Sequence, residues 1–157
     1  MSKSLKRVAR VLEEAGLGAE IREMPESTRT APEAAAAIGC ALDQIVKSIV
    51  FRCEADGTAV LFLTAGGNRV DAAKASALTG TALGKADAAL IRAQTGFVIG
   101  GVAPIGHLSR VRAWWDPRLS EFPVVWAAAG TPRHVFGIAP GDLLTLSGAT
   151  EADFVGD

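Results

Sequence analysis

The segments VKSIVFRC at residues 46–53 and AVLFLT at residues 59–64 decide the fold of this chain, and the polar turn EADG at residues 54–57 lies between them. Both segments are rich in β-branched and aromatic residues, which favour strands. Two such segments joined by a short turn with glycine are typical of a β-hairpin. We therefore expect an antiparallel pair of strands here.

The rest of the sequence predicts short helices and separate strands around this hairpin. Apolar spacing and capping residues predict helices at 5–15, 31–38, 71–78, 87–95 and 140–146. Strands are expected at 19–24, 97–99, 111–115, 124–129 and 134–138. Residues 25–30 are polar and turn-rich, and we expect Thr30 as the N-cap of the next helix with Pro32 in its first positions. Without a regular βαβ alternation, this order favours an α+β fold with a mixed, mainly antiparallel sheet surrounded by short helices.

Length and composition indicate a single globular domain over residues 1–157. A chain of 157 residues can bury one core and is too short for two ordinary domains. Hydrophobic residues make up 49% and charged residues 21%, and the net charge is -1, which argues against disorder. Apolar runs are interrupted well before the roughly 20 residues of a membrane span, and the start MSKSLKR opens no signal peptide. We expect a cytoplasmic protein without membrane contact.

Charge and cysteine content give no clear ligand. The near-neutral charge does not indicate a nucleic-acid partner, although four arginines in the C-terminal half form either a local basic patch or a solvated surface: Arg110, Arg112, Arg118 and Arg133. The two cysteines, Cys40 and Cys53, are too few for a disulfide scaffold and are expected as small core residues. No cysteine or histidine pair has the usual short ligand spacing, so neither a metal nor another cofactor is expected.

The sequence GGVAPIGH at residues 100–107, here called the glycine loop, holds three glycines, a proline and a histidine between two apolar segments. Glycine allows close approach of the main chain, and proline stiffens it. A stiff loop with N–H groups facing outward would suit a carbonyl, a carboxylate or a phosphate. The alternative is a tight connection between two strands.

Lys47 is the other conspicuous residue. In a strand it shares one face with apolar residues at positions 45, 49, 51 and 53, and it is the only polar member. Either its ammonium group reaches water from the strand end, or it occupies a pocket where its charge has a partner and its pKa is altered. Ser48 faces the other way. No carboxylate pair and no GxSxG nucleophile motif is present, so an enzyme of this sequence would work by positioning and electrostatics.

Three segments together resemble the YbaK/ProX family of aminoacyl-tRNA deacylases, which are similar to the editing insertion of bacterial prolyl-tRNA synthetase. They are TAPEAAAAIG at 30–39, QIVKSIVF at 44–51 and the glycine loop, and the resemblance extends to LGKA at 83–86 and GTP at 130–132. It implies an α+β domain whose sheet curls around a small pocket. It also implies hydrolysis of the ester of a mischarged tRNA, with no DNA partner and possible transient contact with prolyl-tRNA synthetase.

The resemblance also implies roles for individual residues. Lys47 matches the lysine that the family needs for activity, and Gly100 and Pro104 match its Gly-x-x-x-Pro loop, whose main chain binds the aminoacyl group. The substrate-binding positions implied are Thr30, Ser48, Gly100, Gly101, Val102, Ala103, Pro104, Gly106, His107 and Thr131.

The sequence of one predicted strand bears on which amino acid is removed. The branch that clears cysteine from proline tRNA carries an acidic residue before the last helix, where this chain has HVFG at 134–137. The sequence is more similar to ProX-type relatives that remove small non-proline residues such as alanine. Two other functions stay open: a non-catalytic module that binds aminoacyl-tRNA ends or an amino-acid-like ligand, and a nucleotide-binding domain, which lacks the required motifs.

Overall fold

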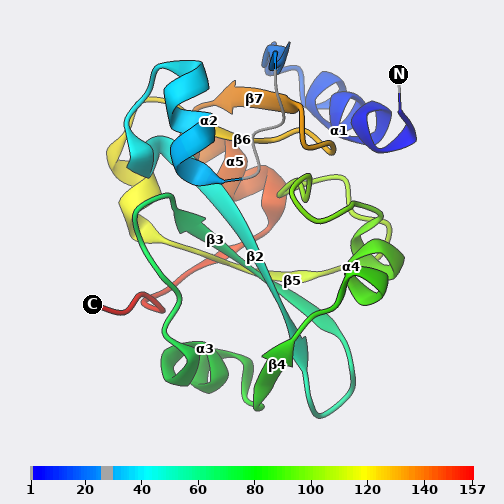
Figure 1. Ribbon diagram of the computed structural model, residues 1–157, viewed down its shortest axis with the longest axis vertical. Coiled ribbons are helices and arrows are strands. Elements are labelled where there is room, and N and C mark those ends of the chain that lie inside the picture. Colours follow the sequence, from blue (N-terminus) through cyan, green and yellow to red (C-terminus); the bar gives the residue numbers. More distant parts are fainter. Residues whose placement is uncertain (1, 26–29) are drawn as a thin grey trace.

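The computed structural model describes residues 2–25 and 30–157, which form one mixed sheet covered by helices (Figure 1). The helices are α1 (Lys3–Glu14), α2 (Ala31–Ile38), α3 (Ala72–Thr79), α4 (Ala88–Thr95) and α5 (Pro140–Ser147), with short 3-10 helices η1 (Leu42–Gln44) and η2 (Pro117–Glu121). The strands are β1 (Ile21–Glu23), β2 (Ile45–Cys53), β3 (Ala59–Ala65), β4 (Leu83–Lys85), β5 (Arg112–Trp115), β6 (Val125–Ala128), β7 (His134–Ile138) and β8 (Thr150–Glu151).

The predicted hairpin forms the centre of the sheet. Strands β2 and β3 pair in antiparallel register from Val46 opposite Ala65 to Arg52 opposite Ala59. Every residue of β3 is buried, because its two faces enter two separate hydrophobic clusters. Leu61 and Leu63 point into the larger cluster and Phe62 into the smaller one. The continuous apolar run at 59–64 therefore reflects a strand covered on both sides.

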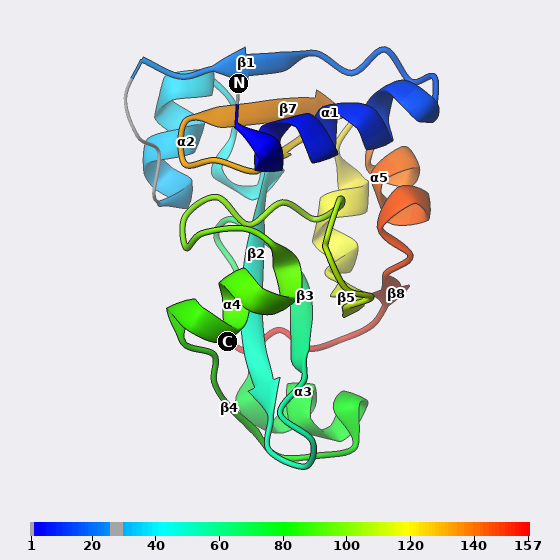
Figure 2. The same cartoon turned by 90° about the vertical axis from the view of Figure 1, so that its right-hand side faces the viewer.

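The sheet is mixed, as the sequence predicts, and curled, as the family resemblance implies (Figure 2). Its order is β1-β7-β6-β2-β3-β5-β8, with β4 added to β2, and parallel pairs join β2 to β6, β3 to β5 and β5 to β8. In Figure 2, β2 and β3 run from top to bottom while β1 and β7 cross above them, which shows the twist between the two ends of the sheet. Helix α1 lies beside β7 in the same view.

Capping residues place the helices as the sequence predicts. The Thr30 hydroxyl accepts a hydrogen bond from the N–H of Glu33 and so begins α2, and Gly39 ends this helix with φ of 84°. Asp71 and Asp87 cap α3 and α4 in the same way. The predicted turn over 25–30 falls mostly outside the described residues.

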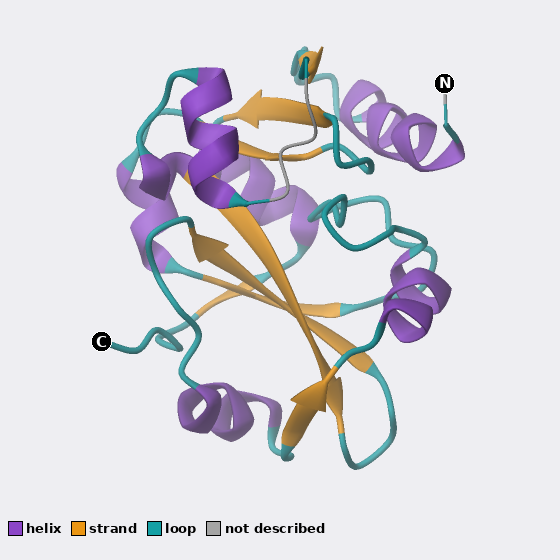
Figure 3. Cartoon of the chain, viewed as in Figure 1, coloured by secondary structure: helices purple, strands orange, loops and turns teal. Residues whose placement is uncertain are grey.

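The predicted strand at 97–99 is wrong. These residues form a loop and a turn after α4 (teal in Figure 3), with Phe97 buried while Ile99 is 61% exposed. Phe97 packs into the core from a loop, so a short apolar run here reflects one anchor residue and not a strand. Conversely, β4 and β8 are too short and too polar to be predicted. Among the described helices, none is long and apolar enough to cross a membrane.

Candidate active site

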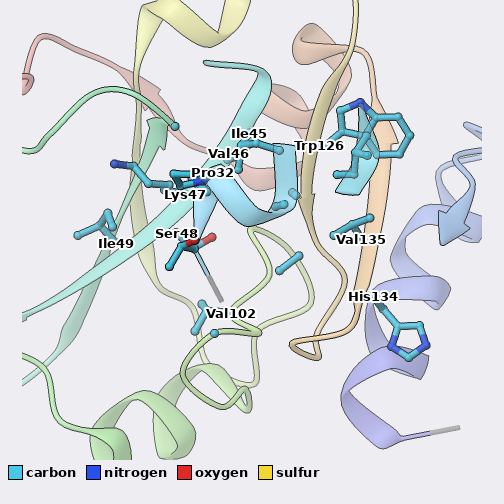
Figure 4. Close-up of a pocket in the computed structure, with 18 of the residues that line it drawn as sticks. Pro32, Ile45, Val46, Lys47, Ser48, Ile49, Val102, Trp126, His134 and Val135 are labelled. Carbon is cyan, nitrogen blue, oxygen red and sulfur yellow. The ribbon is translucent and has the colours of Figure 1, made fainter. Parts of the chain in front are cut away.

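The candidate site is a pocket of about 410 Å³ between α2, β2, β6, the start of β7 and the glycine loop (Figure 4). These walls come from segments far apart in the sequence. Six of the predicted site residues line it: Thr30, Lys47, Ser48, Gly100, Val102 and Thr131. The rest of the lining comes from apolar residues of α2, β2, β6 and β7, together with Gly66 and His134.

A gap in the sheet gives the pocket access to β2. On the side of β2 away from β3, β6 pairs only with Ile45 and Val46, and β4 pairs only with residues 51–53. No described strand pairs with residues 47–50 on this side, and we call this segment the open edge of β2. Side chains from both faces of β2 reach the pocket at this point, including Lys47 and Ser48.

Lys47 is half-buried, and its ammonium group donates a hydrogen bond of 2.5 Å to the main-chain carbonyl of Asn68. Burial lowers the pKa of Lys47, and the nearby Arg69 charge lowers it further, whereas Asp116 and Asp43 oppose the shift. Asp116 is buried and also accepts a hydrogen bond from the Asn68 side-chain amide. Of the two alternatives for Lys47, the structure shows the second: the residue lines the pocket, its ammonium group has a hydrogen-bond partner, and its pKa is altered.

Ser48 lies on the opposite face of β2 from Lys47 and points toward Val102 and the glycine loop (Figure 4). Its hydroxyl oxygen is buried and has no hydrogen-bond partner among the described residues. Buried hydroxyl groups are nearly always hydrogen-bonded, because leaving one unpaired costs roughly 1–3 kcal/mol. The residue is therefore an exception that needs an explanation.

The glycine loop is held more firmly than its sequence indicates. Residues 101–105 are buried, and the His107 Nε2 atom lies 2.7 Å from the carbonyl oxygen of Ala103. Arg7 of α1 donates to the carbonyl oxygens of Gly96 and Gly106 at 2.8 and 3.1 Å. The loop therefore presents only Gly100 and Val102 to the pocket.

Five predicted site residues do not line the pocket: Gly101, Ala103, Pro104, Gly106 and His107. His107 instead braces the loop from within, since it is half-buried and bonds to the Ala103 carbonyl. Burial lowers the pKa of His107 and outweighs the opposing effect of the Ala103 carbonyl, while the Arg7 charge adds to the decrease. A neutral imidazole that donates to a carbonyl is the form that this environment favours.

Among the lining residues that the sequence did not indicate, His134 and Trp126 carry the largest polar and aromatic side chains. The Thr131 hydroxyl lies 2.6 Å from His134 Nδ1 and accepts a hydrogen bond from the N–H of Arg133. The Thr131 hydroxyl and the His134 ring therefore hold each other in place beside the pocket. The signal available in the sequence was the turn at 130–132, which ends just before this histidine.

Trp126 forms an apolar wall with Ile45 and Ile38. The Arg22 guanidinium lies 4.6 Å from the centre of its ring, and a Cβ on Gly137 would come within 2.8 Å of the same ring. The indole thus lies against the bare main chain of β7 and keeps a fixed orientation.

Within the described residues, no group of three or more histidine, cysteine, aspartate or glutamate side chains is arranged to hold a metal ion.

Comparison with known proteins assigns the chain to a family. A model of the aminoacyl-tRNA editing domain matches residues 25–146, which include all the strands and loops that form the pocket. The chain belongs to the aminoacyl-tRNA editing domain family. Its motifs are those of the YbaK/ProX members, in agreement with the resemblance of its sequence.

Individual relatives support the assignment. The uncharacterized protein YwhH of Bacillus subtilis (strain 168) is 30% identical over 128 residues, which cover 82% of this chain and 81% of that protein. A crystal structure of a protein proposed to be a trans-editing enzyme for prolyl tRNA synthetase superposes with a TM-score of 0.91 at 47% identity, covering 100% and 99% of the two chains. The hypothetical protein APE2540 gives a TM-score of 0.87 at 26% identity, covering 96% and 99%.

Proposed function

We propose that this protein is a trans-acting aminoacyl-tRNA deacylase, a hydrolase that cleaves the ester of a mischarged tRNA. The preferred substrate in this proposal is proline tRNA that carries a small non-proline amino acid. A cytoplasmic location and transient contact with prolyl-tRNA synthetase are parts of the same proposal, because such an enzyme acts on tRNA released from the synthetase.

The observation that carries the proposal is the ammonium group of Lys47 at the open edge of β2, in a pocket that Gly100 and Val102 also line. An ammonium group has three N–H donors, and only one is engaged by the Asn68 carbonyl within the described residues. Burial strengthens the electrostatic effect of the remaining charge on any ligand in the pocket. The lysine is thus held in place while it keeps donors available.

This arrangement suits ester hydrolysis. Attack of water on the ester carbonyl forms a tetrahedral oxyanion, which then expels a ribose hydroxyl of the tRNA. Main-chain N–H groups of the glycine loop and the Lys47 ammonium would stabilise this negative charge. The described pocket lining holds no carboxylate. We therefore assign the activation of water to a hydroxyl group of the terminal ribose.

The lining also supports the substrate class. Ala31, Ala34, Ile45 and Trp126 form an apolar wall without a charged side chain, which suits a small aliphatic residue. A synthetase discriminates amino acids that differ by one methylene by only about 1–3 kcal/mol, so a second hydrolytic site is needed for fidelity.

A panel of mischarged tRNAs tests the proposal. Alanyl- and cysteinyl-tRNA for proline, correctly charged prolyl-tRNA and several unrelated pairs are incubated with the protein, and loss of the labelled amino acid is measured. We expect deacylation of the alanyl ester, a weaker effect on the cysteinyl ester and sparing of prolyl-tRNA. Lys47→Ala should lower the rate by at least 100-fold, because it removes a charge that acts on the oxyanion.

The matched control is Lys85→Ala, which removes an exposed lysine from β4 on the neighbouring part of the sheet. It should leave the rate unchanged. Absence of turnover on every ester, or full activity of Lys47→Ala, would contradict the proposal. Saturable binding of alanyl-tRNA without turnover would instead identify a non-catalytic binding module.

A further inference from the structure

The main-chain polar groups of Ser48 face the gap in the sheet. The Cys53 N–H donates to the Thr58 carbonyl and the Cys53 carbonyl accepts from the Gly57 N–H, both at 2.8 Å, so the polar groups of Cys53 point toward the β3 side. The Glu54 N–H donates to Ala82 on the β4 side. The polar groups of successive residues in a strand point to alternate sides. Ser48 is an odd number of residues from Cys53, so its N–H and C=O point away from β3, as the N–H of Glu54 does. They reach the open edge, where no described strand pairs with them.

The Ser48 side chain adds a third group that lacks a partner. Its hydroxyl is buried, forms no hydrogen bond with the described residues and faces the pocket from the side of the glycine loop. A strand position covered by apolar neighbours would tolerate alanine or valine without this cost. The hydroxyl and the free carbonyl of one residue therefore form a pair of acceptors at the wall of the pocket.

The pair of acceptors suits a ligand group with several N–H donors. An aminoacyl ester carries one such group next to the scissile carbonyl, the α-ammonium group. The cationic side chain in the pocket, Lys47, lies on the other face of β2 with its charge directed to Asn68, so it does not occupy these acceptors.

We propose that Ser48 binds the α-ammonium group of the aminoacyl ester through its hydroxyl and its main-chain carbonyl, an inference that rests on the proposed function. The bound amino acid then lies along the open edge of β2 in the manner of a residue added to the sheet. A primary ammonium group can rotate to satisfy both acceptors. Proline has a secondary ammonium group whose ring carbon replaces one N–H and fixes the other two. This site therefore selects against correctly charged prolyl-tRNA.

The experiment compares alanyl-tRNA with lactyl-tRNA, which is obtained from it by nitrous acid and carries a hydroxyl group in place of the ammonium group. Both are given to the wild type, Ser48→Ala and Ser48→Thr. Ser48→Ala should lower kcat/KM for alanyl-tRNA by about tenfold or more, the effect of a lost hydrogen bond to a charged group. It should change lactyl-tRNA hydrolysis by less than threefold. Ser48→Thr, which keeps the hydroxyl, should restore most of the alanyl rate.

Stability provides an independent readout. Because the Ser48 hydroxyl has no partner within the described part of the protein, Ser48→Ala should keep or raise the melting temperature. Ser76→Ala on the distant helix α3 serves as the control and should leave kcat/KM unchanged for both alanyl-tRNA and lactyl-tRNA. Equal losses on both esters, or no loss on alanyl-tRNA, would overturn the assignment.

Failure of the proposed function can be distinguished from failure of this inference. If the wild type hydrolyses no ester, the same comparison is made with dissociation constants for the two tRNAs. A weaker binding of alanyl-tRNA, but not of lactyl-tRNA, by Ser48→Ala supports the role of Ser48 without catalysis. Unchanged dissociation constants refute it.

Discussion

The glycine loop and the open edge of β2 form two sides of one pocket, and they differ in how their polar groups are satisfied. Arg7 ties the loop to α1 by donating to the Gly106 carbonyl, and it also donates to the Gly96 carbonyl at the end of α4. Within the loop, His107 bonds to the Ala103 carbonyl. At the edge of β2, the Ser48 hydroxyl lacks a partner among the described residues, and Lys47 keeps unused donors. The loop is thus held rigidly, whereas the strand edge holds the polar side chains that are available to a ligand.

This difference separates stability from function within a single site. Changes in the loop should affect folding first and activity as a consequence. Changes at the open edge should affect activity while the protein stays folded, since few protein contacts depend on these groups.

The largest effect is expected for Gly101→Ala. A Cβ at this position would lie 2.7 Å from the main-chain carbon of Thr131, which cannot move without shifting the turn that holds His134. We expect a loss of about 1–3 kcal/mol in the free energy of unfolding, together with loss of deacylation. Urea denaturation measures the first quantity.

Gly141→Ala is the control for this substitution, because nothing lies within 4 Å of a Cβ there. It should be neutral or slightly stabilising. If Gly101→Ala were as stable as this control, the loop would not be the rigid side of the pocket.

A smaller effect is expected from pH. Since the pKa of His107 in the folded protein is lowered by burial, the unfolded chain takes up a proton first as the pH falls below about 6.5. The contribution of His107 to stability is therefore complete above that pH and is lost progressively below it. His107→Gln, which keeps a donor for the Ala103 carbonyl, should show a flatter decline of melting temperature between pH 7 and pH 5. Parallel curves would exclude His107 as a source of the pH dependence.

The smallest effect on stability is expected for Lys47→Met. It removes one hydrogen bond to the Asn68 carbonyl and keeps an apolar stem of similar length, so the free energy of unfolding should change by less than about 1 kcal/mol. Deacylation should nevertheless be lost. A strongly destabilised variant would show that the lysine is structural, and the contrast between the two sides of the pocket would disappear.

Local signals in the sequence predicted most of the fold. Helix α2 has the predicted bounds, because its Thr30 cap and terminal Gly39 act within a few residues. The hairpin of β2 and β3 was equally clear from its apolar segments and turn. Strands β4 and β8 have only three and two residues. They exist because neighbouring strands offer a partner, which depends on tertiary structure.

The lining of the candidate pocket was predicted only in part, because the sequence shows local signals but not the tertiary placement of each residue. Lys47 and Gly100 were found because a lysine on an apolar face and a glycine cluster are unusual in any sequence. His134 and Trp126 follow ordinary strand patterns, and only the curl of the sheet brings them to the pocket. The orphan hydroxyl of Ser48 has no counterpart in a sequence pattern, because a missing partner is visible only when all the neighbours are placed.

The wall formed by Trp126 has an optical consequence. The sequence contains three tryptophans and no tyrosine, so tryptophans dominate the ultraviolet fluorescence of the protein. Trp114 and Trp115 are buried in the clusters on either face of the sheet. Trp126 lines the pocket and is already stacked with the Arg22 cation. An emission change on addition of a ligand would therefore arise mainly from Trp126, and Trp126→Phe would remove this intrinsic reporter of occupancy.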